Sequence, residues 1–280
     1  MTLAMEASDA TFTAWQRGSL AHAAELFGLA VRGEPVFGWR LRSIGTSATG
    51  PDGTRWLRVV SDYPEFACGD GWTGNLDANT LTSLATPRVL DTAEWDDDGR
   101  RQRAEVLTLL PGQVISRADV LHQAAELPER WWAELRRTLE TLRATPTQRV
   151  HADQDRITGR AQAALGHDLP IRRWETVHGD LHWNNLHVDP FGLVDWELWG
   201  RGPAGTDAAS LYCHSLLVPD VAERVWAVFA DVLDTIDGRL AQQAVAARML
   251  RRIAGGDYPE LDGPLRHHLA GLTRSSPARR

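Results

Sequence analysis

The sequence contains no lysine, only two cysteines, and no apolar stretch long enough to cross a bilayer. All 30 basic side chains of the 280-residue chain are arginine. Cys68 and Cys213 are too few for a disulfide framework, so reduced thiols are expected. The first residues lack the basic and apolar regions of a secretory signal. These absences predict a cytoplasmic protein without a membrane partner.

Positive charge is also scarce relative to negative charge. The chain carries 37 acidic side chains against 30 arginines, which gives a formal net charge of −7. Nucleic-acid binding depends on cations that neutralise phosphates, so we expect no nucleic-acid partner. Residues 1–110 hold 15 acids and 10 arginines, whereas residues 111–280 hold 22 and 20. This distribution gives little support to a polycationic substrate bound by residues 111–280.

One segment combines two acids and an amide at a spacing that suits phosphoryl transfer. Residues 178–185 read His-Gly-Asp-Leu-His-Trp-Asn-Asn, and Asp195-Trp196-Glu197 follows ten residues later. Phosphoryl transfer requires positioning and neutralisation of phosphate charge by magnesium, which takes oxygen ligands. The side chains of Asn185 and Asp195 supply such oxygens. Asp180 is then the carboxylate that orients the attacking hydroxyl and accepts its proton.

A short hairpin is expected to bring Asn185 and Asp195 together. Residues 186–188 and 193–194 are apolar-rich and flank residues 189–192, where Pro and Gly favour a turn. Both ligands would then lie on neighbouring strands at the open end of the hairpin. Regular pairing would place them on opposite faces. A shared metal therefore requires the chain to leave strand geometry at one of them.

The run His-Gly-Asp-Leu-His-x-x-Asn, followed by Val-Asp-Trp-Glu, resembles the catalytic and metal-binding motifs of the aminoglycoside phosphotransferase and choline kinase group. The likeness is close over residues 175–215. It implies that Asp180 is the catalytic aspartate, that Asn185 and Asp195 bind magnesium, and that His178 and Asp207 support the catalytic loop. The implied activity is transfer of phosphate from ATP, or GTP, to a hydroxyl of an aminoglycoside-like antibiotic or a metabolite.

That group shares the protein kinase fold, so the resemblance implies a two-lobed α+β architecture. Residues 1–110 would form a small, β-rich nucleotide-binding lobe, and residues 111–280 a larger, mainly helical catalytic and substrate lobe. A helix is expected over residues 13–27. The apolar run from Glu105 to Leu110 is expected to be a strand that crosses between the lobes, where the backbone of Leu107 and Leu109 would meet the adenine.

The missing lysine matters because kinase-fold enzymes normally hold the α- and β-phosphates with a lysine on the third strand of the small lobe. The corresponding strand here is Trp56-Leu57-Arg58-Val59-Val60, so Arg58 is the candidate phosphate ligand. Its expected partner is Asp77 in the helical segment 75–81, with Glu65 as a competitor. Gly33, in a predicted turn at residues 31–35 between two strands, is the candidate for close approach to the phosphates.

Three alternatives remain open at this level. Asp180 and Asn185 could belong to an ordinary turn, which would leave the joint spacing of the motifs unexplained. His178, Asp180 and His182 could be ligands of a transition metal in a hydrolase. The chain could also bind a nucleotide with little or no transfer, because it lacks the usual lysine.

Overall fold

The computed structural model describes residues 3–274, which divide into two compact units. The first unit contains the described residues up to Thr80 together with residues 86–110. The second contains residues 81–85 and the described chain from Pro111 onward. Within residues 3–274, none of the helices has the length and apolar character needed to cross a bilayer.

The first unit is an antiparallel sheet with a long helix on one face. Helix α1 (Leu3–Leu26) begins before the predicted start at residue 13. The sheet order is β1-β2-β3-β5-β4, and helix α2 (Asp70–Asp77) lies between β3 and β4 in the chain. The strands are β1 (Ala30–Phe37), β2 (Ser43–Gly50), β3 (Gly53–Asp62), β4 (Val89–Asp97) and β5 (Arg100–Thr108).

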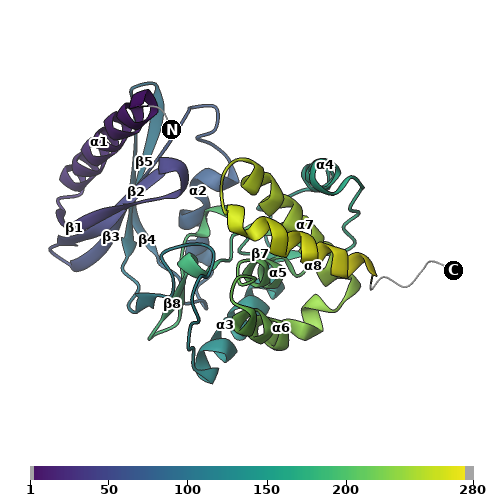
Figure 1. Cartoon of the computed structure of the whole chain (residues 1–280). Helices are drawn as coiled ribbons and strands as arrows, with labels where there is room; N and C mark the ends of the chain where they lie inside the picture. Colours follow the sequence, from purple (N-terminus) through teal and green to yellow (C-terminus); the bar gives the residue numbers. More distant parts are fainter. Residues whose placement is uncertain (1–2, 275–280) are drawn as a thin grey trace. The chain divides into compact units, whose positions relative to one another are not determined.

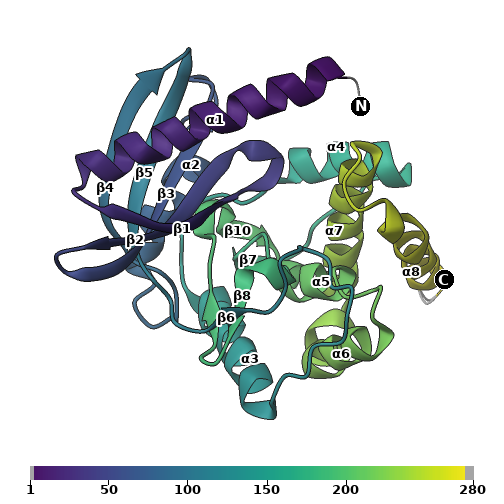
Figure 2. The same cartoon turned by 60° about the vertical axis from the view of Figure 1, so that its left-hand side comes forward.

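Side-chain alternation along β3 decides which face Arg58 occupies. Leu57 and Val59 are buried in a core that α1 completes with Leu20, Ala23 and Ala24, and Figures 1 and 2 show α1 lying along that face. Because successive strand residues point to opposite faces, Arg58 lies on the other face of the sheet.

The second unit is mainly helical and contains two small sheets. The sheets have the orders β10-β7 and β6-β8-β9. Helix α7 packs against α4, α5 and α8, as Figure 1 shows. The helices are α3 (Glu129–Ala144), α4 (Gln154–Leu165), α5 (Thr206–Cys213), α6 (Pro219–Leu233), α7 (Ile236–Ala254) and α8 (Asp262–Arg274). The strands are β6 (Gln113–Val114), β7 (Trp174–Val177), β8 (Leu186–Val188), β9 (Gly192–Leu193) and β10 (Gly200–Pro203).

The α+β architecture, with a β-rich first unit and a mainly helical second unit, agrees with the predicted fold class. The predicted turn around Gly33 is wrong. Residues 31–35 lie inside one strand, β1, and the register shifts between Arg32 and Val36. Gly33 has a φ of 74°, and a bulge on an edge strand tolerates both this glycine and Pro35. The apolar residues on either side therefore belong to one strand and not to two.

Candidate active site

The segment that carries Asp180 connects β7 to β8 and begins with a sharp change of direction at Gly179. Its φ is 82°, a conformation that disfavours a side chain. A Cβ atom at this position would lie 2.2 Å from Nδ1 of His151 and 2.7 Å from the carbonyl oxygen of Leu198. Only glycine fits this backbone, and the next residue, Asp180, takes its direction from it.

Asp207 of helix α5 holds the start of this loop. Its Oδ2 accepts a hydrogen bond from the backbone N–H of His178 at 2.8 Å, and its Oδ1 accepts one from Gly179 at 2.9 Å. The residue is 6% exposed. Burial raises the pKa of Asp207 to about 7, and the two N–H donors act in the opposite direction. The carboxylate therefore satisfies two buried donors that have no strand partner.

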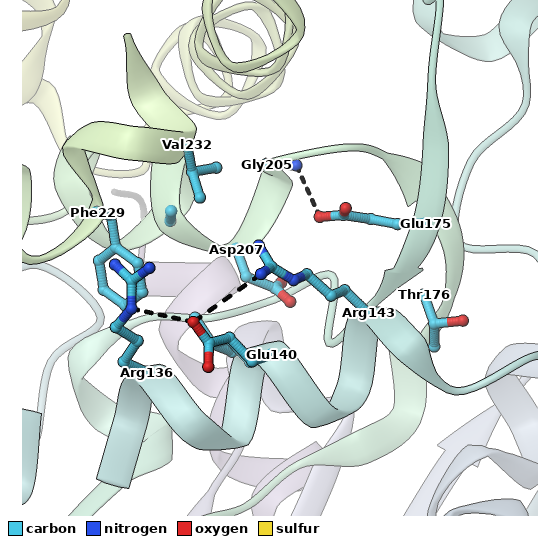
Figure 3. Close-up of a pocket in the computed structure, with 11 residues that line it drawn as sticks. Arg136, Glu140, Arg143, Glu175, Thr176, Gly205, Asp207, Phe229 and Val232 are labelled. Atoms are coloured by element: carbon cyan, nitrogen blue, oxygen red, sulfur yellow. Dashed lines mark hydrogen bonds and ion pairs between the residues drawn. The ribbon is translucent and has the colours of Figure 1, made fainter. Parts of the chain in front are cut away.

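A small pocket borders Asp207 and lies between side chains of α3 and α6 (Figure 3). Arg136, Glu140 and Arg143 line it from α3, and Glu175 accepts a hydrogen bond from the N–H of Gly205 at 2.9 Å. Its volume is about 30 Å³. Such a space holds about one water molecule. It is too small to be the site for an acceptor.

His178 links the two motifs. Its Nε2 lies 3.0 Å from the carbonyl oxygen of Val194, and its ring packs edge-on against Trp196 with a centroid distance of 4.7 Å. The side chain is fully buried, which lowers the pKa of His178 to about 4. The neutral ring therefore donates Nε2–H to Val194. This geometry connects the loop that carries Asp180 to the residue immediately before Asp195.

Asn185 and Asp195 flank the predicted hairpin. Strands β8 and β9 pair antiparallel through Leu186–Leu193 and His187–Gly192. The chain leaves strand geometry at both ends, because Asn185 ends a 3-10 turn and Asp195 is left-handed with φ 62° and ψ 67°. The N–H of Val194 donates to the carbonyl oxygen of Asn185 at 3.0 Å. The departure from strand geometry that a shared metal requires is therefore present.

The donor set at this point suits magnesium. Nδ2 of Asn185 donates to the carbonyl oxygen of Asp180 at 3.0 Å, so the amide uses its nitrogen within the loop and keeps its oxygen for another partner. A carboxylate and an amide oxygen are hard ligands, and magnesium commonly takes only one or two protein ligands beside phosphate and water. Asn185 and Asp195 fit that pattern.

The alternative of a transition-metal site is not supported. Residues 3–274 contain no group of three or more His, Cys, Asp or Glu side chains that could hold a metal ion. His178 directs Nε2 to Val194, whereas His182 directs Nε2 to Asp180. The three candidate ligands of that alternative, His178, Asp180 and His182, therefore do not form such a group in this part of the chain.

Asp180 lies between the imidazole of His182 and the guanidinium of Arg248. Its Oδ2 is 3.6 Å from Nε2 of His182, and its Oδ1 is 3.6 Å from Nη1 of Arg248. Burial by itself would raise the pKa of Asp180, but His182 and Arg248 outweigh burial and hold it well below its usual range. Asp180 is thus ionised at neutral pH and can accept a hydrogen bond from a hydroxyl.

A second acid, Asp119, shares His182 with Asp180. Oδ1 of Asp119 lies 3.6 Å from the same Nε2 of His182, and its Oδ2 lies 3.6 Å from Nη2 of Arg252. The hydroxyl of Tyr258 also donates to Asp119. Burial disfavours the charged imidazole, but the carboxylates of Asp180 and Asp119 outweigh it and raise the pKa of His182. The carboxylates of Asp119 and Asp180 thus lie on either side of His182, and each also faces an arginine of α7.

The sequence indicates His182 only as a possible transition-metal ligand, and sequence reasoning missed Asp119, Arg248 and Arg252. No motif surrounds them. A signal does exist for Arg248, which follows the buried residues Ala241 and Val245 at helical spacing on α7. A charged residue in line with an apolar stripe indicates a specific buried partner.

Arg58 of the first unit has a buried acidic partner. Its Nη1 lies 3.5 Å from Oε2 of Glu105, and the side chains are 14% and 2% exposed. The two residues are opposite each other in the β3–β5 register. Glu105 also accepts hydrogen bonds from Asn75 of α2 at 2.8 Å and from Arg103 at 3.1 Å. An acid on β5, which the sequence did not suggest, thus holds Arg58 and connects it to α2.

The other predicted nucleotide-binding residues occupy different places in the first unit. Asp77 ends α2 and accepts a hydrogen bond from Thr73 at 2.6 Å. Leu107 is buried in β5, and Leu109 lies beyond the end of that strand and is 43% exposed. Gly33 lies in the β1 bulge. Their roles, including the pairing of Asp77 with Arg58, stay predictions.

Solved structures with a similar fold are phosphotransferases and kinases. A thermostable mutant of aminoglycoside phosphotransferase APH(4)-Ia, in its apo form, aligns with a TM-score of 0.64 and 15% identity over 93% of this chain and 100% of that one. Macrolide 2'-phosphotransferase MphH from Brachybacterium faecium aligns with a TM-score of 0.55 and 16% identity, covering 93% and 99%. A choline/ethanolamine kinase family protein from Mesorhizobium loti aligns with a TM-score of 0.52 and 16% identity, covering 95% and 96%.

At these identities the structural likeness shows the fold, which is protein kinase-like. A comparison with curated proteins found no match. The family model described as "Phosphotransferase enzyme family" matches residues 70–263, more than half of the chain. That stretch includes Asp180, Asn185, Asp195 and Asp207. The chain therefore belongs to the phosphotransferase enzyme family, as the resemblance of its motifs predicted.

Proposed function

We propose that this phosphotransferase transfers the γ-phosphoryl group of ATP to a hydroxyl of a small molecule and requires magnesium. The observation that supports the proposal is the geometry around Asp180, where an ionised carboxylate shares one loop with Asn185, and the β8–β9 hairpin separates Asn185 from the second candidate oxygen ligand, Asp195. The acceptor is an aminoglycoside-like antibiotic or a hydroxylated metabolite. Solved complexes of APH(4)-Ia mutants contain ADP or AMP-PNP together with hygromycin B, which supports this class of donor and acceptor.

Each residue of the proposed site has its own role. Asp180 would accept a hydrogen bond from the acceptor hydroxyl and take its proton as the bond to phosphorus forms. Because its pKa is low, the carboxylate is a weak base, and orientation of the hydroxyl is its larger contribution. Asn185 and Asp195 would hold magnesium, which when bound neutralises charge on the phosphates. His178 and Asp207 hold the loop in place through the contacts described above.

Arg58 is proposed to contact the nucleotide phosphates in the place of lysine. Glu105 orients the guanidinium of Arg58, and the side chain of Arg58 is only 14% exposed. Arginine offers a planar fork of donors and stays charged, whereas lysine is a compact point charge. The contact geometry with the phosphates would therefore differ from that of a lysine-containing kinase.

The alternative function is a nucleotide-binding protein without efficient transfer. Such a protein would bind the nucleotide but would not turn it over.

Asp195→Ala tests the proposed metal site. We expect the variant to lose magnesium-dependent binding of ATP, with an increase in Kd of about 100-fold or more, because one of two protein ligands is removed. Isothermal titration calorimetry with and without magnesium measures this directly. Asp220→Ala, at an exposed acid in the first turn of α6, is the control and should bind like the wild type. Wild-type protein that binds no ATP with magnesium would contradict the proposal.

Arg58→Met tests the phosphate ligand. We expect an increase in the Kd for magnesium–ATP of about tenfold, or about 1.4 kcal/mol, because a charged contact to phosphate is lost while Glu105 keeps Arg103 and Asn75. Arg58→Lys should give an intermediate value. Arg55→Met is the matched control, since Arg55 lies on the same strand and its guanidinium donates to the nearby carbonyl oxygens of Thr54 and Asp52. Equal affinities in wild type and Arg58→Met would remove Arg58 from the site.

A further inference from the structure

Arg248 of α7 reaches the catalytic loop from a distant part of the sequence. Its Nη1 donates to the carbonyl oxygen of Gly179 at 2.6 Å and lies 3.6 Å from Oδ1 of Asp180. Its Nη2 donates to Oγ of Ser210 on α5 at 3.2 Å. The side chain is 12% exposed. One guanidinium thus joins the loop, the proposed base and a second helix.

The peptide groups on both sides of Gly179 are held by different helices. Asp207 of α5 accepts the N–H of Gly179, and Arg248 of α7 donates to its carbonyl oxygen. The backbone at Gly179 is left-handed and closely surrounded, so the loop has little freedom to adjust. Because Asp180 follows directly, these contacts decide where its carboxylate lies.

The chemistry of this contact requires a guanidinium. The two terminal nitrogens donate to Gly179 and Ser210 at the same time, while the charge of the group faces Asp180. A lysine ammonium is a compact donor that cannot reproduce the planar fork. An apolar side chain would fill the space on α7 without the cost of burying a charge. The contact therefore indicates a role beyond packing.

We propose that Arg248 is a positioning residue for the phosphotransfer reaction, which fixes the Gly179 carbonyl and the Asp180 carboxylate so that Asp180 meets the acceptor hydroxyl. This inference rests on the proposed function of Asp180. It adds to that function a requirement for α7, which carries none of the motif residues. Arg248 acts through Asp180 and is assigned no contact with the acceptor or the nucleotide.

The test compares Arg248→Ala and Arg248→Lys with Arg251→Ala, an exposed arginine on the same helix. The reaction measured is hydrolysis of magnesium–ATP, with water as the acceptor. We expect Arg248→Ala to lower kcat by about 10- to 100-fold and to leave KM for ATP within about twofold, because the nucleophile and not the nucleotide is misplaced. Arg248→Lys should lose less, and Arg251→Ala should match the wild type.

Chemical rescue separates positioning from general damage. Guanidinium chloride at a concentration too low to unfold the protein should restore part of the kcat of Arg248→Ala, and methylammonium should restore less. Wild-type kcat in Arg248→Ala would overturn the proposal. A loss confined to KM would overturn it as well, since that result means a nucleotide contact. If Arg248→Ala does not fold, the kcat of Arg248→Lys decides in the same way.

Amide hydrogen exchange tests the contact between Arg248 and the loop without a measurement of turnover. We expect peptides that cover residues 178–186 to exchange faster in Arg248→Ala than in Arg251→Ala, with protection of α5 retained. Wild-type protein that neither binds nor hydrolyses magnesium–ATP would remove the proposed function. In that case faster exchange in Arg248→Ala still supports the contact as the restraint on the loop. Unchanged exchange overturns it.

Discussion

Replacement of Asp180 by asparagine is expected to lower kcat for phosphoryl transfer by about 10³-fold while the Kd for magnesium–ATP stays within about twofold. Asparagine has the size of aspartate but cannot accept the proton of the acceptor hydroxyl. It also removes the negative charge that aligns this hydroxyl. Steady-state release of ADP, measured with an acceptor or with water, reports kcat, and calorimetry reports nucleotide binding.

The fold around Asp180 should survive this substitution. Arg248 keeps its bonds to Gly179 and Ser210, and His182 keeps its contact with Asp119. The midpoint of thermal unfolding should therefore change little. If the midpoint of thermal unfolding falls together with kcat, the loss of activity comes from unfolding and does not support Asp180 as the base.

Asp119→Asn is the matched control for Asp180→Asn. Both acids lie 3.6 Å from Nε2 of His182, and both carry a second contact 3.6 Å from an arginine of α7. They differ in sequence context, because only Asp180 lies five residues before Asn185. We expect the Asp119 variant to retain kcat within about tenfold. If Asp119→Asn were the inactive variant and Asp180→Asn the active one, the assignment of the base would be wrong.

The parts of the site that sequence reasoning located are encoded within a few tens of residues. The turn residues between residues 188 and 193 predict the hairpin, and the hairpin determines which residues flank it. The need for irregular backbone at Asn185 or Asp195 follows from the two-residue period of a strand. These predictions depend on local geometry alone, so no knowledge of tertiary packing was needed.

The parts that were missed depend on pairing between distant segments. The prediction named Asp77, the acid on the next helix, as a partner of Arg58, and did not include Glu105, which lies on β5. Strand β3 pairs with β5, and this register sets Arg58 directly opposite Glu105. That pair becomes visible only when the strand order is known. Arg248 reaches Gly179 for the same reason, because the packing of α7 on α5 is tertiary.

Asp207→Ala is expected to lower the free energy of unfolding by about 2–4 kcal/mol. The substitution leaves the buried N–H groups of His178 and Gly179 without acceptors, and each such group costs about 1–3 kcal/mol. Removal of a buried carboxylate recovers part of its desolvation cost, which places the net effect below the upper limit of that sum. Urea unfolding at neutral pH measures the difference.

Asp207→Asn is expected to lower the free energy of unfolding by less than Asp207→Ala does. Its single amide oxygen can accept from one of the two N–H groups, and its NH₂ group faces the other, so we expect about half the destabilisation of Asp207→Ala. Asp220→Ala should stay within about 0.5 kcal/mol of the wild type because Asp220 is exposed. The loop should also lose order in Asp207→Ala, because the N–H of Gly179 loses its acceptor while its carbonyl oxygen keeps the bond from Arg248. Wild-type stability in Asp207→Ala would mean that the two N–H groups find other acceptors, and Asp207 would no longer explain how the loop is held.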